Sequence, residues 1–369
     1  MKDKAVAVSG TRKHYIDNLR WADVLLLIPY QAALAWNCWG EPDYVTFGES
    51  RAVSSIIVFF SPYFMPLMFL LAGISTSFAL KKRSCKEYLK ERALRLLVPL
   101  VFGTFVLMPP LSYIGDKFNR GYEGSFFSHY KIFFTRFTDL VGADGGFSFG
   151  QFWFLLYLFV ISCIAAGVWA VLKKRGTSEV KALPFPVVLL LGLPLPLLAE
   201  VLSIGGKSLA EYTYIFLLGQ YVFSKDEVMQ KAEKYCPFTL MTGILAAVAD
   251  VYLFLWTEGS FTLINTIAKF AAEWLMVAGL MGAGKRWFDK SSSFTAVMSK
   301  FSFPFFSLHF LWTVLFQYLM ADTFRKSTAL MYLIPVISAY AATFACCAIV
   351  LKIPPLCFLM GVKYQKKRA

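Results

Sequence analysis

The sequence predicts an all-α, multi-pass membrane protein with about ten transmembrane helices and with both termini in the cytoplasm. Of its 369 residues, 57% are hydrophobic and only 16% are charged, against about 25% charged in an average globular chain. The apolar residues gather in long runs, and most lysines and arginines gather between alternate runs. A water-soluble fold cannot bury that much apolar surface, so we expect lipid to surround the helices.

Ten apolar runs approach the length of a span, which is about 20 residues with a range of roughly 17–25. Backbone polar groups in lipid have to find partners within the chain, and these continuous runs lack the alternation typical of a transmembrane β-barrel. We therefore expect helices over residues 21–38, 52–80, 94–115, 151–172, 183–203, 208–224, 236–256, 262–283, 301–321 and 329–353.

Positive charge predicts the orientation of these helices. Ten spans place 27 of the 37 lysines and arginines on one side and eight on the other. This asymmetry follows the positive-inside rule and puts both ends of the chain in the cytoplasm. Because the charge is spread over separate connections, the net charge of +14 does not indicate nucleic-acid binding. The basic segments are residues 1–20, 81–95, 173–181, 225–234, 285–300 and the tail after residue 361.

One predicted loop is much longer than the rest. Residues 116–150 fall on the extracytoplasmic side and are rich in Phe, Tyr and Gly. Loops of this length are usually functional or disordered, so this one either helps to bind an extracytoplasmic substrate or caps the bundle. We expect a single transmembrane domain over residues 1–369.

The seven cysteines lie mostly inside apolar runs and lack the paired spacing of a disulfide framework or a zinc site. They are expected to be small side chains compatible with lipid. No metal site is predicted.

Ionisable side chains inside spans cost at least about 2.5–3.5 kcal/mol on insertion scales, so each is a candidate functional group. Lys269 and Glu273 stand four residues apart and are expected to form an ion pair. Asp23 follows Arg20 by three residues, which favours a salt bridge between them. His309 lies in mid-span without a local partner, and it is either a packing residue or a catalytic one.

Arg20 and Gln31 are a more informative pair. Eleven helical residues turn through about 1100°, close to three full turns, and rise about 16 Å. The two side chains are therefore expected on one face, Arg20 at the cytoplasmic rim and Gln31 near mid-membrane. This geometry suits a long ligand with an anionic head at the rim and its reactive end in the bundle.

Arg92 and Arg95 stand three residues apart at the start of the third predicted span. Guanidinium groups bind phosphate through forked hydrogen bonds, and a helix N-terminus adds a favourable field. Alternatively, both side chains reach up to lipid headgroups, as basic residues at span ends commonly do.

These residues also belong to motifs of a known family. The chain resembles the bacterial membrane acyltransferase family 3, whose members are O-acyltransferases that modify cell-surface polysaccharides and related acceptors. The resemblance covers nearly the whole chain. It is carried by Tyr15-Ile-Asp-Asn-Leu-Arg20-Trp21, by Met65 to Ser75 with its small residues around Gly73, by Glu91-Arg92-Ala-Leu-Arg95, by Phe152-Trp153-Phe154, and by Ser302-Phe-Pro304 through His309.

The resemblance implies transfer of an acyl group, commonly acetyl, from cytoplasmic acyl-CoA. The acceptor would be a hydroxyl of a cell-envelope carbohydrate or a lipid-linked molecule, and the enzyme would lie in the plasma membrane. Arg92 and Arg95 would hold the CoA phosphates. Arg20 would belong to the family's Arg-x₁₀-His pattern and assist at the phosphates.

The sequence departs from that pattern at two positions. Gln31 stands where the family has histidine, and Gln151 stands where relatives often carry histidine before the Trp-Phe pair. A glutamine amide does not titrate, whereas a general base has to take a proton. Gln31 can orient an acceptor or a thioester, so the base is expected to be His309 first and Asp23 second.

The leading hypothesis is a membrane acyltransferase with an atypical site made by Arg20, Gln31, Arg92, Arg95 and His309. A second hypothesis is a non-catalytic acyl-CoA-binding or lipid-binding protein on the same fold. A third is a small-molecule transporter, which the prolines of the fifth predicted span favour because they interrupt a helix.

Overall fold

The computed structural model describes residues 12–137, 139–176, 181–257, 262–324 and 327–363. Its first helices are α1 (His14–Leu25), α2 (Leu27–Leu34), α3 (Arg51–Phe60), α4 (Phe64–Lys82), α5 (Cys85–Phe102), π-helix η1 (Gly103–Leu107), α6 (Met108–Arg120) and α7 (Phe126–Thr135). Next come 3₁₀-helix η2 (Gly150–Phe152), α8 (Trp153–Lys174), α9 (Phe185–Leu190), α10 (Leu195–Leu198), strands β1 (Ser203–Ile204) and β2 (Lys207–Ser208), and α11 (Leu209–Leu218). The last are π-helix η3 (Gly219–Phe223), α12 (Asp226–Val251), π-helix η4 (Tyr252–Trp256), α13 (Thr262–Trp287), α14 (Ser293–Met320), α15 (Thr328–Val350) and α16 (Pro354–Leu359).

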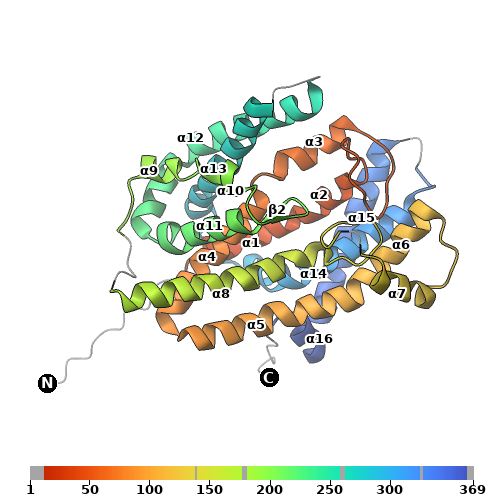
Figure 1. Cartoon of the computed structure of the whole chain (residues 1–369), viewed down its shortest axis with the longest axis horizontal. Helices are drawn as coiled ribbons and strands as arrows, with labels where there is room; N and C mark the ends of the chain where they lie inside the picture. The colour runs from red at the N-terminus through yellow and green to blue at the C-terminus, as the bar shows by residue number, and fades with distance from the viewer. Residues whose placement is uncertain (1–11, 138, 177–180, 258–261, 325–326, 364–369) are drawn as a thin grey trace.

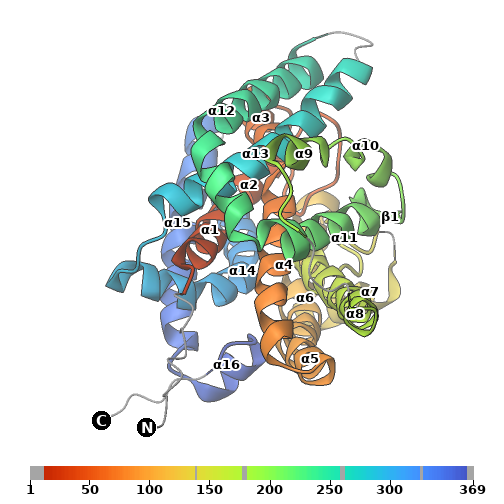
Figure 2. The ribbon, with the colours of Figure 1, turned by 90° about the vertical axis from the view of Figure 1, so that its left-hand side faces the viewer.

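Most of the long helices run side by side along the long axis of the molecule (Figure 1). Seen from the left-hand side of that view, α12 and α13 lie at the top of the bundle and α5 and α8 lie low in it (Figure 2). The strands of the described residues form one two-residue antiparallel hairpin. The predicted all-α membrane fold is confirmed.

Seven helical segments of the described residues are long and apolar enough to cross a membrane. The three other predicted spans, residues 21–38, 183–203 and 208–224, are helical but interrupted or short. The count of ten spans and the cytoplasmic position of both ends therefore remain predictions. The seven segments are Arg51–Lys82, Cys85–Arg120, Gly150–Lys174, Asp226–Trp256, Thr262–Trp287, Ser293–Met320 and Thr328–Val350.

The first predicted span is two helices, which meet at Leu26 shortly before Pro29. Proline has no N–H to donate to the carbonyl four residues earlier, which is that of Leu25. The hydroxyl of Tyr340 on α15 donates to that carbonyl at 2.6 Å. On the other side of α2, Gln317 of α14 donates to the Ala32 carbonyl at 2.9 Å. Neighbouring helices thus satisfy the freed backbone group and hold α2 in place.

The long predicted loop contains a helix, α7, which the sequence analysis did not expect. Asp116 joins the loop to the end of α6, because it accepts from His129 at 2.7 Å and from Arg136 at 2.8 Å. The Tyr130 hydroxyl donates to the Phe105 carbonyl, which Pro109 leaves without its usual partner. The described part of the loop is therefore packed against the bundle (Figure 1).

Segments predicted to be cytoplasmic contact one another at one end of the bundle. Lys13 lies 2.5 Å from Asp226, and the Asn18 amide donates to the Phe288 carbonyl at 2.6 Å. These contacts join the start of α1 to the start of α12 and to the connection between α13 and α14. The same end therefore collects residues whose charge predicts a cytoplasmic position.

Two glycines allow α4 to approach the segment formed by α11 and η3. A methyl group on Gly73 would lie 1.9 Å from the Phe216 carbonyl oxygen, and one on Gly219 would lie 2.2 Å from that of Leu70. Backbone atoms cannot yield easily at such distances, so the close crossing requires glycine. This crossing sets the position of α4 and therefore the positions of the residues that follow Gly73.

We expect Gly73→Ala to lower the free energy of unfolding by about 1–3 kcal/mol, because the added methyl overpacks the crossing. The measurement is the thermal unfolding midpoint of purified protein in detergent. Gly167→Ala on α8 is the matched control, since its added methyl meets nothing within 4 Å. Equal midpoints for the two variants would contradict the packing argument.

Candidate functional site

Two arginines that are far apart in the sequence bind adjacent hydroxyls of α4. Arg20 Nη2 donates to Ser75 Oγ at 3.1 Å, and Arg92 Nη2 donates to Thr76 Oγ1 at 3.0 Å. Because Ser75 and Thr76 are neighbours, α1 and α5 bring both guanidinium groups to the same part of α4. Two of the three arginines named as phosphate ligands therefore lie together.

Arg95 lies at the edge of this group. Its side chain is 50% exposed, and its Nη1 is 3.7 Å from Glu91 Oε1. It lies close enough to Arg20 for their positive charges to repel each other. Glu91 is shared, because Arg83 and Lys363 also contact it.

We call the cluster formed by Arg12, Arg20, Arg83, Arg92, Arg95 and Lys363 the basic lip. Only two carboxylates pair with these six cations, those of Asp17 and Glu91, among the residues that the structure describes. The lip therefore has more positive than negative charge, which favours an anionic ligand.

Arg92 is held by neutral hydroxyls. Thr76 Oγ1 donates to the Ala72 carbonyl at 3.0 Å, so Tyr88 Oη donates to Thr76 at 2.8 Å. Tyr88 Oη in turn accepts from Arg92 Nε at 3.1 Å. Within the described residues no carboxylate pairs with Arg92, so its charge remains available to a ligand.

Thr76 and Tyr88 were not predicted as partners of Arg92, and no role was predicted for Ser75. A signal existed for Tyr88, which precedes Arg92 by four residues on one helix. None existed for Ser75 and Thr76, because small hydroxyl residues are common in spans. Their role appears only when the rotation of α4 is known.

The predicted salt bridge between Arg20 and Asp23 is wrong. Arg20 Nη1 lies 3.2 Å from Asp17 Oδ1 instead. Side chains on a helix point toward its N-terminus, so Arg20 extends back to Asp17 and not forward to Asp23. The Asp23 side chain is buried and makes no hydrogen bond with any described residue.

Asp23 lines a small cavity of about 10 Å³ between α1, α2, α4, α8 and α14. This is roughly the space that one water molecule needs. The other lining residues are apolar: Val24, Leu27, Phe64, Met65, Met68, Phe154 and Phe306. The cavity therefore places one carboxyl group in an apolar compartment one helical turn from Arg20.

Gln31 lies on α2 with a partly exposed side chain. Its side chain makes no hydrogen bond within the described part of the chain. Leu27 lines the cavity, and Gln31 follows it by four residues in the same helix, so it lies one turn further along that face. The break at Leu26 changes the regular helix that the sequence analysis assumed between Arg20 and Gln31.

His309 is fully buried on α14, and its protonation pattern follows from its one partner. Nδ1 lies 2.7 Å from the Phe306 carbonyl oxygen. A carbonyl only accepts, so Nδ1 carries the proton and Nε2 keeps its lone pair. Nε2 is buried and accepts no hydrogen bond from any described residue. Phe306, whose carbonyl accepts the hydrogen bond from Nδ1, also lines the cavity beside Asp23.

Gln151 and Thr104 add two polar atoms close to the same helix. Gln151 Nε2 donates to the Ser307 carbonyl at 3.2 Å, two residues before His309. Gln151 Oε1 and Thr104 Oγ1 are buried without partners. Their segments η2 and η1 contact each other and α14. Interruptions such as η1 often occur at functional sites, so this region is the second part of the candidate site.

The predicted ion pair between Lys269 and Glu273 is also wrong. No carboxylate of the described residues lies within 4.0 Å of Lys269, whose Nζ lies 5.4 Å from the ring centroid of Phe270. Glu273 instead lies close enough to Glu211 of α11 for the two carboxyl groups to interact. The fold brings these two groups together from different helices.

Close groups of three or more His, Cys, Asp or Glu side chains, which a metal site would need, do not occur in the described part of the chain.

In the connection after α2, Asp43 is buried with one oxygen unpartnered. Burial raises its pKa to about 7, so this carboxyl titrates near neutral pH.

The family model of an acyltransferase domain, that of acyltransferase family 3, matches residues 13–352. The chain belongs to acyltransferase family 3. The resemblance carried by the motifs is thereby confirmed, and all five predicted site residues lie within the match. No curated protein and no solved structure matches the chain. Family membership supports a multi-pass membrane acyltransferase.

Proposed function

We propose that this acyltransferase moves an acyl group, most simply acetyl, from cytoplasmic acyl-CoA to a hydroxyl of a cell-envelope carbohydrate or similar acceptor. The proposed location of the enzyme is the plasma membrane. The observation that carries the proposal is the pairing of Arg20 and Arg92 on the adjacent hydroxyls of Ser75 and Thr76 in α4.

In this proposal the basic lip binds the phosphates of CoA. Guanidinium groups form forked, charge-assisted hydrogen bonds with phosphate oxygens. Arg92 is the main ligand because neutral groups hold it, and Arg20 and Arg95 assist from either side. Before the donor binds, Glu91 and Asp17 reduce the repulsion between the positive charges of the lip.

The compartment beside Asp23 would receive the thioester end of the donor once its lining side chains move apart, because at about 10 Å³ it has room for roughly one water molecule. A compartment this small favours an acetyl group over a long acyl chain. Met65 and Met68 line it, and their unbranched side chains adapt readily to a ligand. Gln31, one turn further along, would orient the thioester or the acceptor through its amide.

His309 would act as the general base. Its free Nε2 takes the proton of the acceptor hydroxyl as that oxygen attacks the thioester carbonyl. The carbon–sulfur bond then breaks, an ester remains on the acceptor, and the CoA sulfur leaves and takes up the proton. The neutral imidazole suits a lipid-embedded site better than an ionised carboxylate does.

We expect Arg92→Ala to weaken binding of CoA roughly 10- to 100-fold, because it removes charge-assisted hydrogen bonds worth about 1.5–3 kcal/mol. Arg95→Ala is expected to weaken it as well. The measurement is calorimetry with CoA on purified protein. Arg286→Ala, at the same end of the bundle, is the matched control. Equal affinities for the Arg92 and Arg286 variants would count against a donor site at the lip.

We expect His309→Ala to slow acyl transfer by about 10²–10⁴-fold while CoA affinity stays unchanged, since a general base acts on the chemical step. The measurement is CoA release from acetyl-CoA, with water as the simplest acceptor. His14→Ala, at the start of α1, is the control. A loss confined to Asp23→Asn, with His309→Ala fully active, would assign the base to Asp23 instead.

A non-catalytic acyl-CoA binder on the same fold is the second candidate, favoured by glutamine at both positions 31 and 151. Under the acyltransferase proposal, Gln31→His raises acetyl-CoA turnover by less than about tenfold, because His309 already supplies the base. The measurement is the same CoA-release assay. Negligible turnover in the native protein and a large gain in the variant would mark the native site as degenerate.

A further inference from the structure

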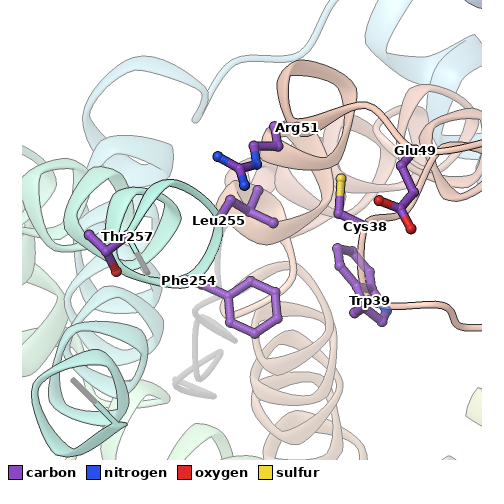
Figure 3. A pocket seen from close by; sticks show the side chains of 7 residues that line it. All are labelled: Cys38, Trp39, Glu49, Arg51, Phe254, Leu255 and Thr257. Carbon is purple, nitrogen blue, oxygen red and sulfur yellow. The ribbon is translucent and has the colours of Figure 1, made fainter. Parts of the chain in front are cut away.

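A second cavity, of about 530 Å³, lies at the opposite end of α2 from the basic lip. We call it the outer pocket. It is formed by the connection after α2, the start of α3 and the end of η4 (Figure 3). Its volume falls in the usual range for small-molecule sites, roughly 300–1,000 Å³. Its lining residues are Cys38, Trp39, Glu49, Arg51, Phe254, Leu255 and Thr257.

Side-chain hydrogen bonds hold the walls of this pocket. Trp39 Nε1 donates to Glu41 at 2.9 Å, which orients the indole. Ser54 of α3 donates to the Trp36 carbonyl at 2.9 Å and contacts Cys38 Sγ at 3.3 Å. The pocket is thus largely preformed, and a ligand does not have to order it.

Two aromatic rings packed against each other are one feature of the lining. The ring centroids of Trp39 and Phe254 are 5.8 Å apart, with their planes inclined at 59° (Figure 3). Phe254 is 48% exposed. A cyclic ligand with apolar C–H faces would cover these rings and bury apolar area.

One acidic and one basic side chain are the other feature. Glu49 and Arg51 are exposed and form no ion pair with each other or with any other described residue. Charged side chains avoid the lipid core, so they place this end of α3 at the membrane surface. The charge count predicts that this surface faces away from the cytoplasm.

The chemistry of this lining selects a class of ligand. A guanidinium only donates hydrogen bonds and a carboxylate only accepts them. A hydroxyl does both, so the hydroxyls of one ligand can accept hydrogen bonds from Arg51 and donate hydrogen bonds to Glu49. One positive and one negative group disfavour a strongly charged ligand of either sign.

We propose that the outer pocket binds a neutral sugar unit, with its ring against Trp39 and Phe254 and its hydroxyls on Glu49 and Arg51. The identity of this sugar as the acyl acceptor depends on the proposed function, whereas the binding does not. Gln31 lies on α2, which ends at Leu34, and Cys38 follows four residues later. The outer pocket therefore lies just beyond the end of the helix that carries Gln31.

The test is saturation-transfer NMR with a panel of methyl hexosides and purified full-length protein, without any CoA. The detergent must be free of sugar, such as an amine oxide. Wild-type protein should show transfer to at least one glycoside. Trp39→Ala should weaken that binding roughly tenfold or more, as loss of an aromatic anchor does. Glu49→Gln, an exposed and nearly isosteric change, should also weaken it.

Trp287→Ala is the matched control, because this tryptophan is 51% exposed on α13 and lies outside the pocket. Its binding should equal that of wild type. The proposal is overturned if no glycoside binds, or if Trp39→Ala binds as well as Trp287→Ala. It is also overturned if mass spectrometry finds a retained phospholipid that only Trp39→Ala releases, because the pocket would then hold lipid. Glycoside binding with no CoA binding would sink the proposed function and leave the pocket assignment intact.

Discussion

The candidate site depends on one interaction, the binding of two guanidinium groups by the consecutive hydroxyls of Ser75 and Thr76. Each arginine comes from a different helix, so their meeting requires α4 to present these two residues at a fixed rotation and depth. The crossing at Gly73 supplies that constraint, because the Phe216 carbonyl leaves no room for a side chain two residues before Ser75. The packing of α4 on α11 therefore determines where positive charge gathers.

A second constraint concerns the backbone in lipid. Each proline inside a span leaves a carbonyl without its donor, and an unsatisfied group there is costly. Tyr340 fills this role for Leu25, and Tyr130 does so for Phe105. Tyr340 comes from a helix distant in the sequence and Tyr130 from the helix that follows α6, so these bonds also hold α2 and α7 to the bundle. The position of Gln31 on α2 follows from the hydrogen bond between Tyr340 and Leu25 and from that between Gln317 and Ala32.

The sequence predicted the helical bundle and the grouping of Arg20 with Arg92, because apolar runs and family motifs are properties of single segments. The predictions were wrong where a side chain had more than one available partner. Arg20 pairs with Asp17 and not Asp23 because helix side chains point toward the N-terminus. Glu273 lies near Glu211 of another helix, α11, and no spacing within one helix reveals that. The loop helix α7 was missed because its aromatic residues resemble those of an irregular cap.

The two ends of the molecule differ in a way that a transmembrane transfer reaction requires. The basic lip has an excess of unpaired positive charge, which suits a phosphate-bearing donor. The outer pocket has balanced charge and aromatic faces, which suit a neutral acceptor. Between them the chain places few ionisable groups, and His309 holds its lone pair through a hydrogen bond to its own helix. In the proposed reaction, a base that is neutral before it reacts adds no standing charge to the membrane interior, and the imidazolium would last only until the leaving sulfur takes its proton. Glutamine at position 31 is therefore compatible with this proposal, because the proton would go to Nε2 of His309.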